Sequence, residues 1–376
     1  MCENFGMQSY DSSPMHSKAT IKRAMPLKPL WKWGIALIAA ISGNALAQEV
    51  TLKISHFFPP TSNAHANILV PWTQRVEAAS KGRIKFQIYP SMQLGGAPNQ
   101  LFDQAKDGVA DIVWTLPGYT PGRFPKSEVF ELPLMVQSAE QASRAAWEYS
   151  QKHLLDEFKG VKLLSVHTHD AGLLHMVKKP VRTLEDLRGE KLRAPNRVAN
   201  KMLAALGASP VSLPFTALQE GLSKGILDGL FITWEALPST KINEVVKFHT
   251  EMPEGSPALY TSVIVIAMNE AKYKGLPAEL RAILDKNSGM ELAALIGRTW
   301  DQSAIAARQA EMGSGDKLLT LDPKEYARWQ EAGQRVTRDW VAEMKAKNID
   351  AVTLLDDAQR LLAKHAVKAK GQALSR

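Results

Sequence analysis

Cysteine is almost absent from this chain, because the single copy among its 376 residues is Cys2. A chain with one cysteine cannot form an internal disulfide or a cysteine-ligated zinc site. Cys2 also lies within the N-terminal segment that we expect to be removed, which would leave no thiol for catalysis. The fold must therefore be stabilised by its apolar core, for which a hydrophobic content of 45% is sufficient.

The apolar run near the N-terminus, residues 33–47, is shorter than the roughly 20 residues that span a bilayer. Basic residues precede this run, and residues 45–47 (Ala-Leu-Ala) match a small-x-small cleavage site. We therefore predict a cleavable signal peptide over residues 1–47, in which residues 1–24 are a candidate start-site extension. The alternative is an uncleaved membrane anchor. An exported chain without cysteine fits the bacterial periplasm.

Clustered charge is missing as well, although the formal net charge is +8. Basic and acidic residues are interspersed, apart from a basic tail that begins near Lys364. A nucleic-acid-binding surface requires a clustered basic stripe. We therefore expect no nucleic-acid partner.

Enzyme signatures are absent too: there is no G-x-S-x-G elbow, P-loop, G-x-G-x-x-G or H-E-x-x-H motif. His167 and His169 are spaced to face one side of a strand, but no third or fourth metal ligand is evident nearby. We interpret them as polar lining or core residues and predict no cofactor and no metal. A periplasmic lyase or hydrolase acting on organic acids is the rival function, with His167, His169 and Glu235 as its acid/base candidates.

Strand and helix patterns alternate along the chain after the signal. Residues 50–56, 84–89 and 111–114 have strand patterns, and residues 67–79 and 100–108 between them have helix patterns. This β-α-β-α-β order predicts an α/β fold with parallel strands and right-handed crossovers.

A second unit of the same kind lies between residues 161 and 233, and residues 291–312 predict one long helix. The chain length favours two domains, yet no linker rich in Pro, Gly or Ser separates the two units. We infer that the chain crosses between the units more than once and that these crossings form a hinge.

Polar and aromatic side chains follow several predicted strands. Ligands of open parallel sheets bind outside the carboxyl ends of the strands. The candidate ligand-binding residues are Trp114, Tyr119, His167, His169, Arg193, Asn196, Phe215, Trp234 and Glu235. Arg193 is the most informative, because a guanidinium matches a carboxylate through two parallel hydrogen bonds. One cation among aromatic walls suits an organic anion with an apolar body.

Each of these residues also has a structural interpretation. Arg193 could form a surface ion pair with the nearby Glu190. Trp114 and Trp234 could be ordinary core residues, and the loop around Tyr119 could serve only to join a strand to a helix.

Five stretches, in a fixed order, carry a family resemblance: residues 93–96, 107–111, 131–134, 187–195 and 217–229. Together they resemble the DctP-like substrate-binding proteins of TRAP transporters, the tripartite ATP-independent periplasmic carriers. The resemblance covers essentially the whole mature chain. It implies that Arg193 forms the salt bridge to the substrate carboxylate and that Phe215 lines the cleft.

The resemblance also implies a two-lobed periplasmic binding protein fold, type II-like, with a long helix spanning both lobes. Lobe I would contain residues 48–170 and about 259–300, and lobe II residues 171–258 and about 301–376 with the C-terminal helices. The lobes would close over the ligand and dock on integral membrane permease subunits. The protein would be a monomer or a homodimer, and a ligand-sensing partner of a membrane receptor is another alternative.

Two departures from the family pattern bear on the ligand. Many relatives have a second arginine where this chain has Leu174, and a polar stretch where it has the apolar residues 230–234. A lost cation and added apolar groups favour a monocarboxylate with an apolar or aromatic body, including 2-oxo and hydroxy acids. Some members bind such acids together with a metal cation, for which Glu235 would be the candidate ligand.

Overall fold

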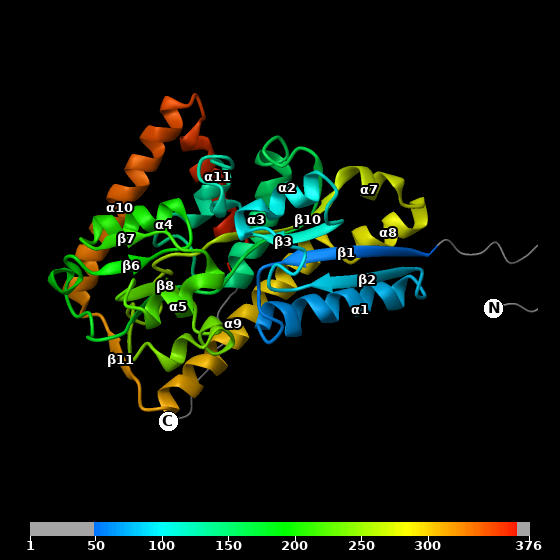
Figure 1. Ribbon diagram of the computed structural model, residues 1–376. Helices are drawn as coiled ribbons and strands as arrows, with labels where there is room; N and C mark the ends of the chain where they lie inside the picture. The colour runs from blue at the N-terminus through cyan, green and yellow to red at the C-terminus, as the bar shows by residue number, and fades with distance from the viewer. Residues whose placement is uncertain (1–48, 367–376) are drawn as a thin grey trace, which may run out of the picture. The chain divides into compact units, whose positions relative to one another are not determined.

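The computed structural model describes residues 49–366. The predicted signal peptide of residues 1–47, with its candidate start-site extension, lies outside the described residues, as do residues 367–376. Within residues 49–366, no helix is both long enough and apolar enough to cross a membrane. Two mixed β-sheets with helices packed around them make up this part of the chain (Figure 1).

The first sheet has five strands in the order β2-β1-β3-β10-β4. Its strands are β1 (Val50–His56), β2 (Ile84–Tyr89), β3 (Ile112–Thr115), β4 (Val161–Thr168) and β10 (Val263–Asn269). β1 pairs in parallel with β2 and β3, which confirms the predicted β-α-β-α-β unit. β10 lies antiparallel between β3 and β4, so the sheet is mixed rather than fully parallel.

The second sheet has six strands in the order β11-β9-β5-β8-β6-β7. Its strands are β5 (Leu173–Met176), β6 (Lys191–Arg193), β7 (Ser209–Val211), β8 (Gly229–Ile232), β9 (Phe248–Glu251) and β11 (Lys317–Thr320). β6 pairs in parallel with β7 and β8, as predicted, whereas β5 runs antiparallel to β8 and β9. Strands β5, β9 and β11, each four residues long, were not predicted from the sequence.

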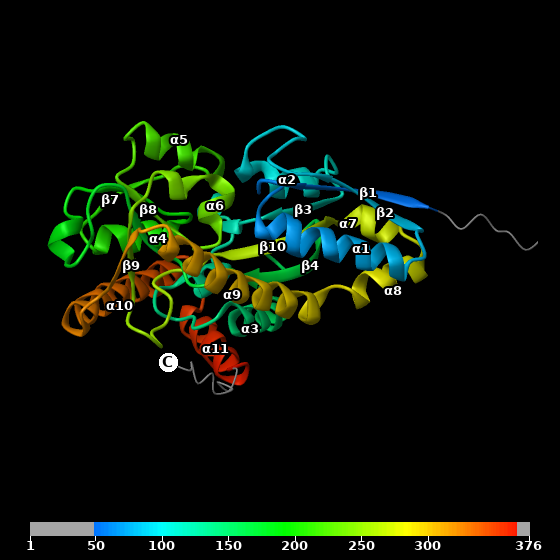
Figure 2. The same ribbon diagram turned by 90° about the horizontal axis from the view of Figure 1, so that it is seen from below.

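The longest helix, α9, runs from the first sheet towards the second (Figure 2). The helices are α1 (Val70–Ala79), α2 (Leu101–Lys106), α3 (Ala139–His153), α4 (Arg197–Ala205), α5 (Leu218–Ser223), α6 (Ala236–Thr240), α7 (Glu270–Gly275), α8 (Ala278–Lys286), α9 (Gly289–Gly313), α10 (Pro323–Ala346) and α11 (Ala351–Lys364). The first part of α9 packs on α3 and β4. Farther along α9, Arg308 Nε donates to Glu251 Oε1 of β9 at 2.7 Å. This arrangement confirms the predicted long helix that spans both lobes.

The chain passes between the two sheets three times: from β4 to β5, from β9 to β10, and through α9 to β11. The first two passages lie side by side, because Gly172 N donates to the Tyr260 carbonyl at 3.1 Å. Several crossings without a linker were expected, and they form the connection that would bend on closure. The lobe boundaries themselves stay a prediction.

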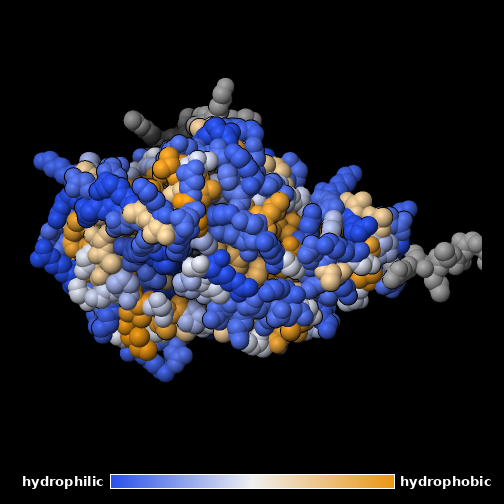
Figure 3. Space-filling view, turned by 90° about the horizontal axis from the view of Figure 1, so that it is seen from above, coloured by the Kyte–Doolittle hydropathy of each residue, from blue (hydrophilic) through white to orange (hydrophobic). Residues whose placement is uncertain are grey.

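Helix α10 buries large apolar side chains. Trp329 and Trp340 of α10 are each at most 1% exposed. The following helix, α11, packs on α3, where the Gln141 side chain donates to the Leu362 carbonyl at 2.8 Å. Seen from above, the described surface is largely hydrophilic, with apolar residues in separate small areas (Figure 3).

Gly297 marks the closest approach of α9 to α3. A Cβ at this position would lie 2.5 Å from the Ala139 carbonyl oxygen and 2.6 Å from the Glu140 Cα. Both are backbone atoms, which a side-chain rotation cannot move away. We expect Gly297→Ala to lower the free energy of unfolding by about 1–3 kcal/mol, as overpacking of a core does, even though alanine favours helix.

Gly313 provides the matched control for this prediction. It lies in the same helix, and a Cβ there would meet nothing within 4 Å. Gly313→Ala should leave stability unchanged or raise it slightly. Denaturant unfolding of both variants measures the difference, and equal stabilities would show that α9 and α3 are not in such close contact.

Candidate ligand-binding site

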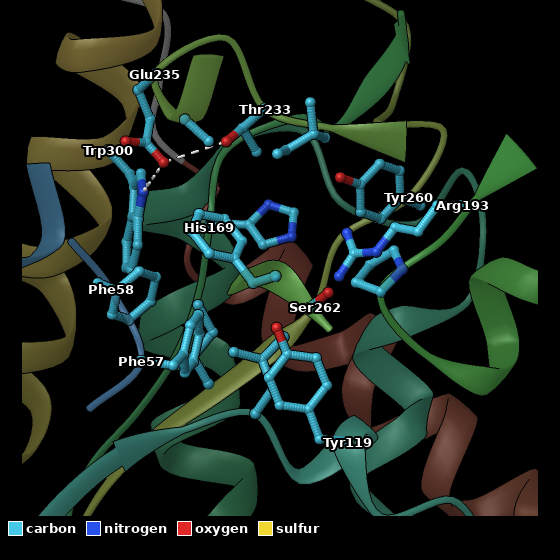
Figure 4. Close-up of a pocket in the computed structure, with 16 residues that line it drawn as sticks. Phe57, Phe58, Tyr119, His169, Arg193, Thr233, Glu235, Tyr260, Ser262 and Trp300 are labelled. Atoms are coloured by element: carbon cyan, nitrogen blue, oxygen red, sulfur yellow. Dashed lines mark hydrogen bonds between the residues drawn. The ribbon is translucent and has the colours of Figure 1, made fainter. Parts of the chain in front are cut away.

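Strand ends from both sheets converge on one cavity (Figure 4). It is lined by Phe57, Phe58, Leu116, Tyr119, His169, Arg193, Pro195, Phe215, Ile232, Thr233, Glu235, Ala236, Tyr260, Ser262, Ile264 and Trp300. Most of these residues follow β1, β3, β4, β6 or β8, as expected for open α/β sheets. The empty space between these residues, including the part that is open to solvent, is about 430 Å³.

Arg193 ends β6 and is only 2% exposed. Its Nε donates to the Leu213 carbonyl at 3.1 Å, and its buried Nη2 has no hydrogen-bond partner among the described residues. The surface ion pair with Glu190 is not formed, because Glu190 pairs with Lys179 at 2.8 Å. No described carboxylate forms an ion pair with Arg193 in residues 49–366. A buried cation without a counter-charge is costly, so this geometry is suited to an anion from outside the chain.

Aromatic rings form the walls of the cavity. The Phe57 ring packs edge-on against Tyr119 and Phe215, each at a centroid distance of 5.4 Å. The ring centroids of Phe57 and Phe58 lie 4.1 Å apart. The Trp300 indole of α9 stands beside Phe58 in Figure 4. These faces offer a planar apolar body both dispersion contacts and edge-to-face contacts.

His169 lies between the aromatic wall and Arg193 (Figure 4). Its Nδ1 donates to the Asp170 carbonyl at 2.6 Å. Because a carbonyl oxygen only accepts, Nδ1 carries the proton and Nε2 is left as an acceptor. Burial is the main cause that lowers the pKa of His169 to about 4, and Arg193 lowers it further. The imidazole is therefore neutral at physiological pH.

Glu235 lines the cavity near the start of α6. Its Oε1 accepts hydrogen bonds from Trp300 Nε1 at 3.0 Å and from Thr233 Oγ1 at 3.2 Å. Burial raises the pKa of this carboxyl, and the two hydrogen bonds only partly oppose that rise. Between residues 49 and 366, no group of three or more His, Cys, Asp or Glu side chains is placed to hold a metal ion.

Five of the predicted site residues line the cavity: Tyr119, His169, Arg193, Phe215 and Glu235. Trp114 and His167 lie behind it instead. Trp114 Nε1 donates to His167 Nε2 at 2.9 Å, and His167 stacks on Trp300 at 5.6 Å. Since Nε2 accepts, the protonated Nδ1 donates to Ser165 Oγ at 3.0 Å, so both nitrogens of His167 are used within the protein.

Trp234 and Asn196 also lie outside the cavity lining. Trp234 packs on His175 and His249 and donates to Glu251 Oε1 at 2.9 Å. Asn196 caps α4, accepting from Ala199 N at 2.8 Å. Its Nδ2 donates to Ser262 Oγ at 3.1 Å, which links α4 to the segment that precedes β10. Both side chains support the site rather than border it.

Several lining residues were not predicted from the sequence. Phe57 and Phe58 directly follow β1, so the strand-end rule would have identified them. Tyr260 lies in the passage from β9 to β10, and Trp300 lies in the middle of α9. Neither has a local sequence signal, because tertiary packing alone brings them to the cavity.

Comparisons with known proteins agree on one family. Residues 54–344 match the family DctP, bacterial extracellular solute-binding protein, family 7. A TRAP solute-binding protein from Rhodoferax ferrireducens T118, solved in complex with copurified benzoate, is 45% identical to this chain. The alignment covers 84% of this chain and 98% of that chain, with a TM-score of 0.83.

Two further solved structures are similar over most of their length. A marine metagenome TRAP solute-binding protein specific for aromatic acid ligands, in complex with 3-hydroxybenzoate, is 41% identical, covering 85% of this chain and 100% of that one with a TM-score of 0.83. A TRAP periplasmic solute-binding protein from Bordetella bronchiseptica, with bound (R)- and (S)-mandelate, is 32% identical. That alignment covers 84% of this chain and 99% of the other, with a TM-score of 0.78.

Asp170 lies beside the site and yields a prediction about stability. Its side chain is 3% exposed, and neither carboxyl oxygen has a hydrogen-bond partner among the described residues. Burial, followed by the nearby carboxyls of Glu235 and Asp301, raises the pKa of Asp170 well above its usual value. The folded state therefore holds this proton at a pH where the unfolded chain has released it, so stability falls as pH rises through that window.

Asp170→Asn replaces the titrating carboxyl with a neutral amide and should therefore remove this fall in stability with rising pH. We expect the variant to melt on the order of 2 °C or more above the unmodified protein near pH 7, with the difference shrinking towards pH 4. Thermal unfolding as a function of pH measures it, with Asp356→Asn on the exposed side of α11 as control. A difference that does not change with pH would contradict the prediction.

Proposed function

The chain belongs to the DctP family, the extracellular solute-binding proteins of TRAP transporters, and we propose that it captures a small aromatic monocarboxylate for import. As a member of this family it is a binding protein and not an enzyme, so the lyase or hydrolase alternative is set aside. The observation that carries the proposal is the buried Arg193 guanidinium without a counter-charge in a cavity with aromatic walls.

The carboxylate of the ligand pairs with Arg193. A guanidinium presents donors in a planar fork, and a carboxylate accepts from two of them in parallel. Nε is already bonded to Leu213, whereas Nη2 is buried and has no partner in the described chain. The ligand thus supplies the hydrogen bonds and the negative charge that the protein leaves out.

The proposed substrate is an organic acid with one carboxylate and an aromatic ring. Among the cavity residues Arg193 is the only arginine or lysine, which favours a single negative charge. Leu174, at the position of the family's second arginine, is fully buried in β5 and does not line the cavity. The ligands of the three similar structures, benzoate, 3-hydroxybenzoate and mandelate, are aromatic acids with one carboxylate, and this supports the same class here.

Closure of the two lobes over the ligand would prepare the protein to deliver it to a membrane permease. Residues from both sheets contact the ligand, so contacts are gained when the lobes come together, and ligand binding shifts the equilibrium towards the closed state. We propose that the closed protein, exported to the periplasm, docks on the integral membrane subunits of a TRAP permease. Periplasmic relatives support this location.

Arg193→Ala should weaken binding of benzoate by about 100-fold or more, because the buried carboxylate loses its counter-charge and its hydrogen bonds. The affinity of Arg193→Lys for benzoate should lie between those of Arg193→Ala and the unmodified protein, since an ammonium keeps the charge but lacks the planar fork. Isothermal titration calorimetry with the purified mature protein measures both dissociation constants.

Arg188→Ala is the matched control, because Arg188 lies in the same sequence motif but is exposed and does not line the cavity. Its affinity for benzoate should equal that of the unmodified protein. Unchanged affinity in Arg193→Ala would assign the carboxylate to another residue.

A further inference from the structure

Glu235 lies across the cavity from Arg193 (Figure 4). In that view the Arg193 side chain stands beside Tyr260 on one side, and Glu235 stands above the Trp300 indole on the other. Much of the lining between them is apolar, including Phe57, Phe58 and Ile264. A ring whose carboxylate pairs with Arg193 therefore points its far edge towards the Glu235 carboxyl.

The hydrogen bonds of Glu235 are unevenly distributed. Trp300 Nε1 and Thr233 Oγ1 both donate to Oε1, while Oε2 has no hydrogen-bond partner among the described residues. Neither donor is charged, and no described Lys, Arg or His forms an ion pair with this carboxyl. One oxygen is thus held in place by the protein, and the other is left to bond a ligand.

The protonation state sets what this oxygen offers. Burial raises the pKa of Glu235 and favours the neutral acid. With Oε1 accepting two hydrogen bonds, the proton resides on Oε2, which then needs an acceptor. An ionised Glu235 would instead accept a hydrogen bond through the same oxygen. A hydroxyl group can satisfy either form, because it both donates and accepts.

We propose that Glu235 bonds a hydroxyl substituent on the ring of the ligand, on the side away from its carboxylate, so that the site prefers hydroxylated aromatic acids over the unsubstituted acid. This inference rests on the proposed function, since Arg193 must hold the carboxylate for the ring to be oriented. Trp300 and Thr233 are positioning residues: their hydrogen bonds hold the Glu235 carboxyl at the cavity.

The test compares ratios of dissociation constants for benzoate, 3-hydroxybenzoate and 4-hydroxybenzoate. The unmodified protein should bind at least one hydroxybenzoate about tenfold more tightly than benzoate, the effect of one well-placed hydrogen bond. Glu235→Gln keeps a donor and an acceptor and should retain most of this preference. Glu235→Leu should reduce the ratio to near one. Glu244→Leu, the same change at an exposed residue away from the cavity, should retain the full ratio.

Each outcome has a separate meaning. If the unmodified protein binds benzoate at least as tightly as both hydroxybenzoates, or if Glu235→Leu keeps the preference, the role of Glu235 is wrong and the proposed function stands. If the unmodified protein binds none of the three acids, the proposed ligand class fails, and this inference fails with it. Thermal unfolding establishes that each variant is folded. If Glu235→Leu is not, Glu235→Ala, which also removes both carboxyl oxygens, takes its place and should likewise reduce the ratio to near one.

Discussion

The Arg193 guanidinium is buried at the end of β6, where its Nε donates a hydrogen bond to the Leu213 carbonyl. Nη2 has no partner in the described chain, and Glu190, the nearest acidic residue in sequence, is paired with Lys179. Burying a charge is unfavourable unless an opposite charge and hydrogen bonds compensate it. The carboxylate of the proposed ligand would supply that opposite charge, within a cavity lined by strand ends of both sheets.

The proposed closure would use the same physics. In an open cleft water would solvate both the guanidinium and an incoming carboxylate, and closing would exchange that water for the ion pair and for contacts with Phe57 and Phe215. The passages between the sheets meet where Gly172 N donates to the Tyr260 carbonyl. Tyr260 also lines the cavity, so the connection between the sheets and the candidate binding site share a residue.

Strand ends were predictable from the sequence because the carboxyl-end rule needs only local patterns. Where this rule predicted the lining wrongly, it failed at single residues near a strand end. His167 is within β4 and belongs to the core, whereas His169, just beyond its end, reaches the cavity. After β8, Thr233 and Glu235 line the cavity, while Trp234 between them packs on His175 in the turn that leads into α6.

The other features depend on tertiary structure. The antiparallel course of β10 is set by where the chain re-enters the first sheet, and Trp300 reaches the cavity only because α9 crosses it.

The most direct test of the account is a crystal structure of the mature protein with benzoate. We predict the carboxylate paired with Arg193, including Nη2, and the ring between the Phe57 and Trp300 side chains. A ring bound elsewhere, with Arg193 facing solvent, would contradict the account.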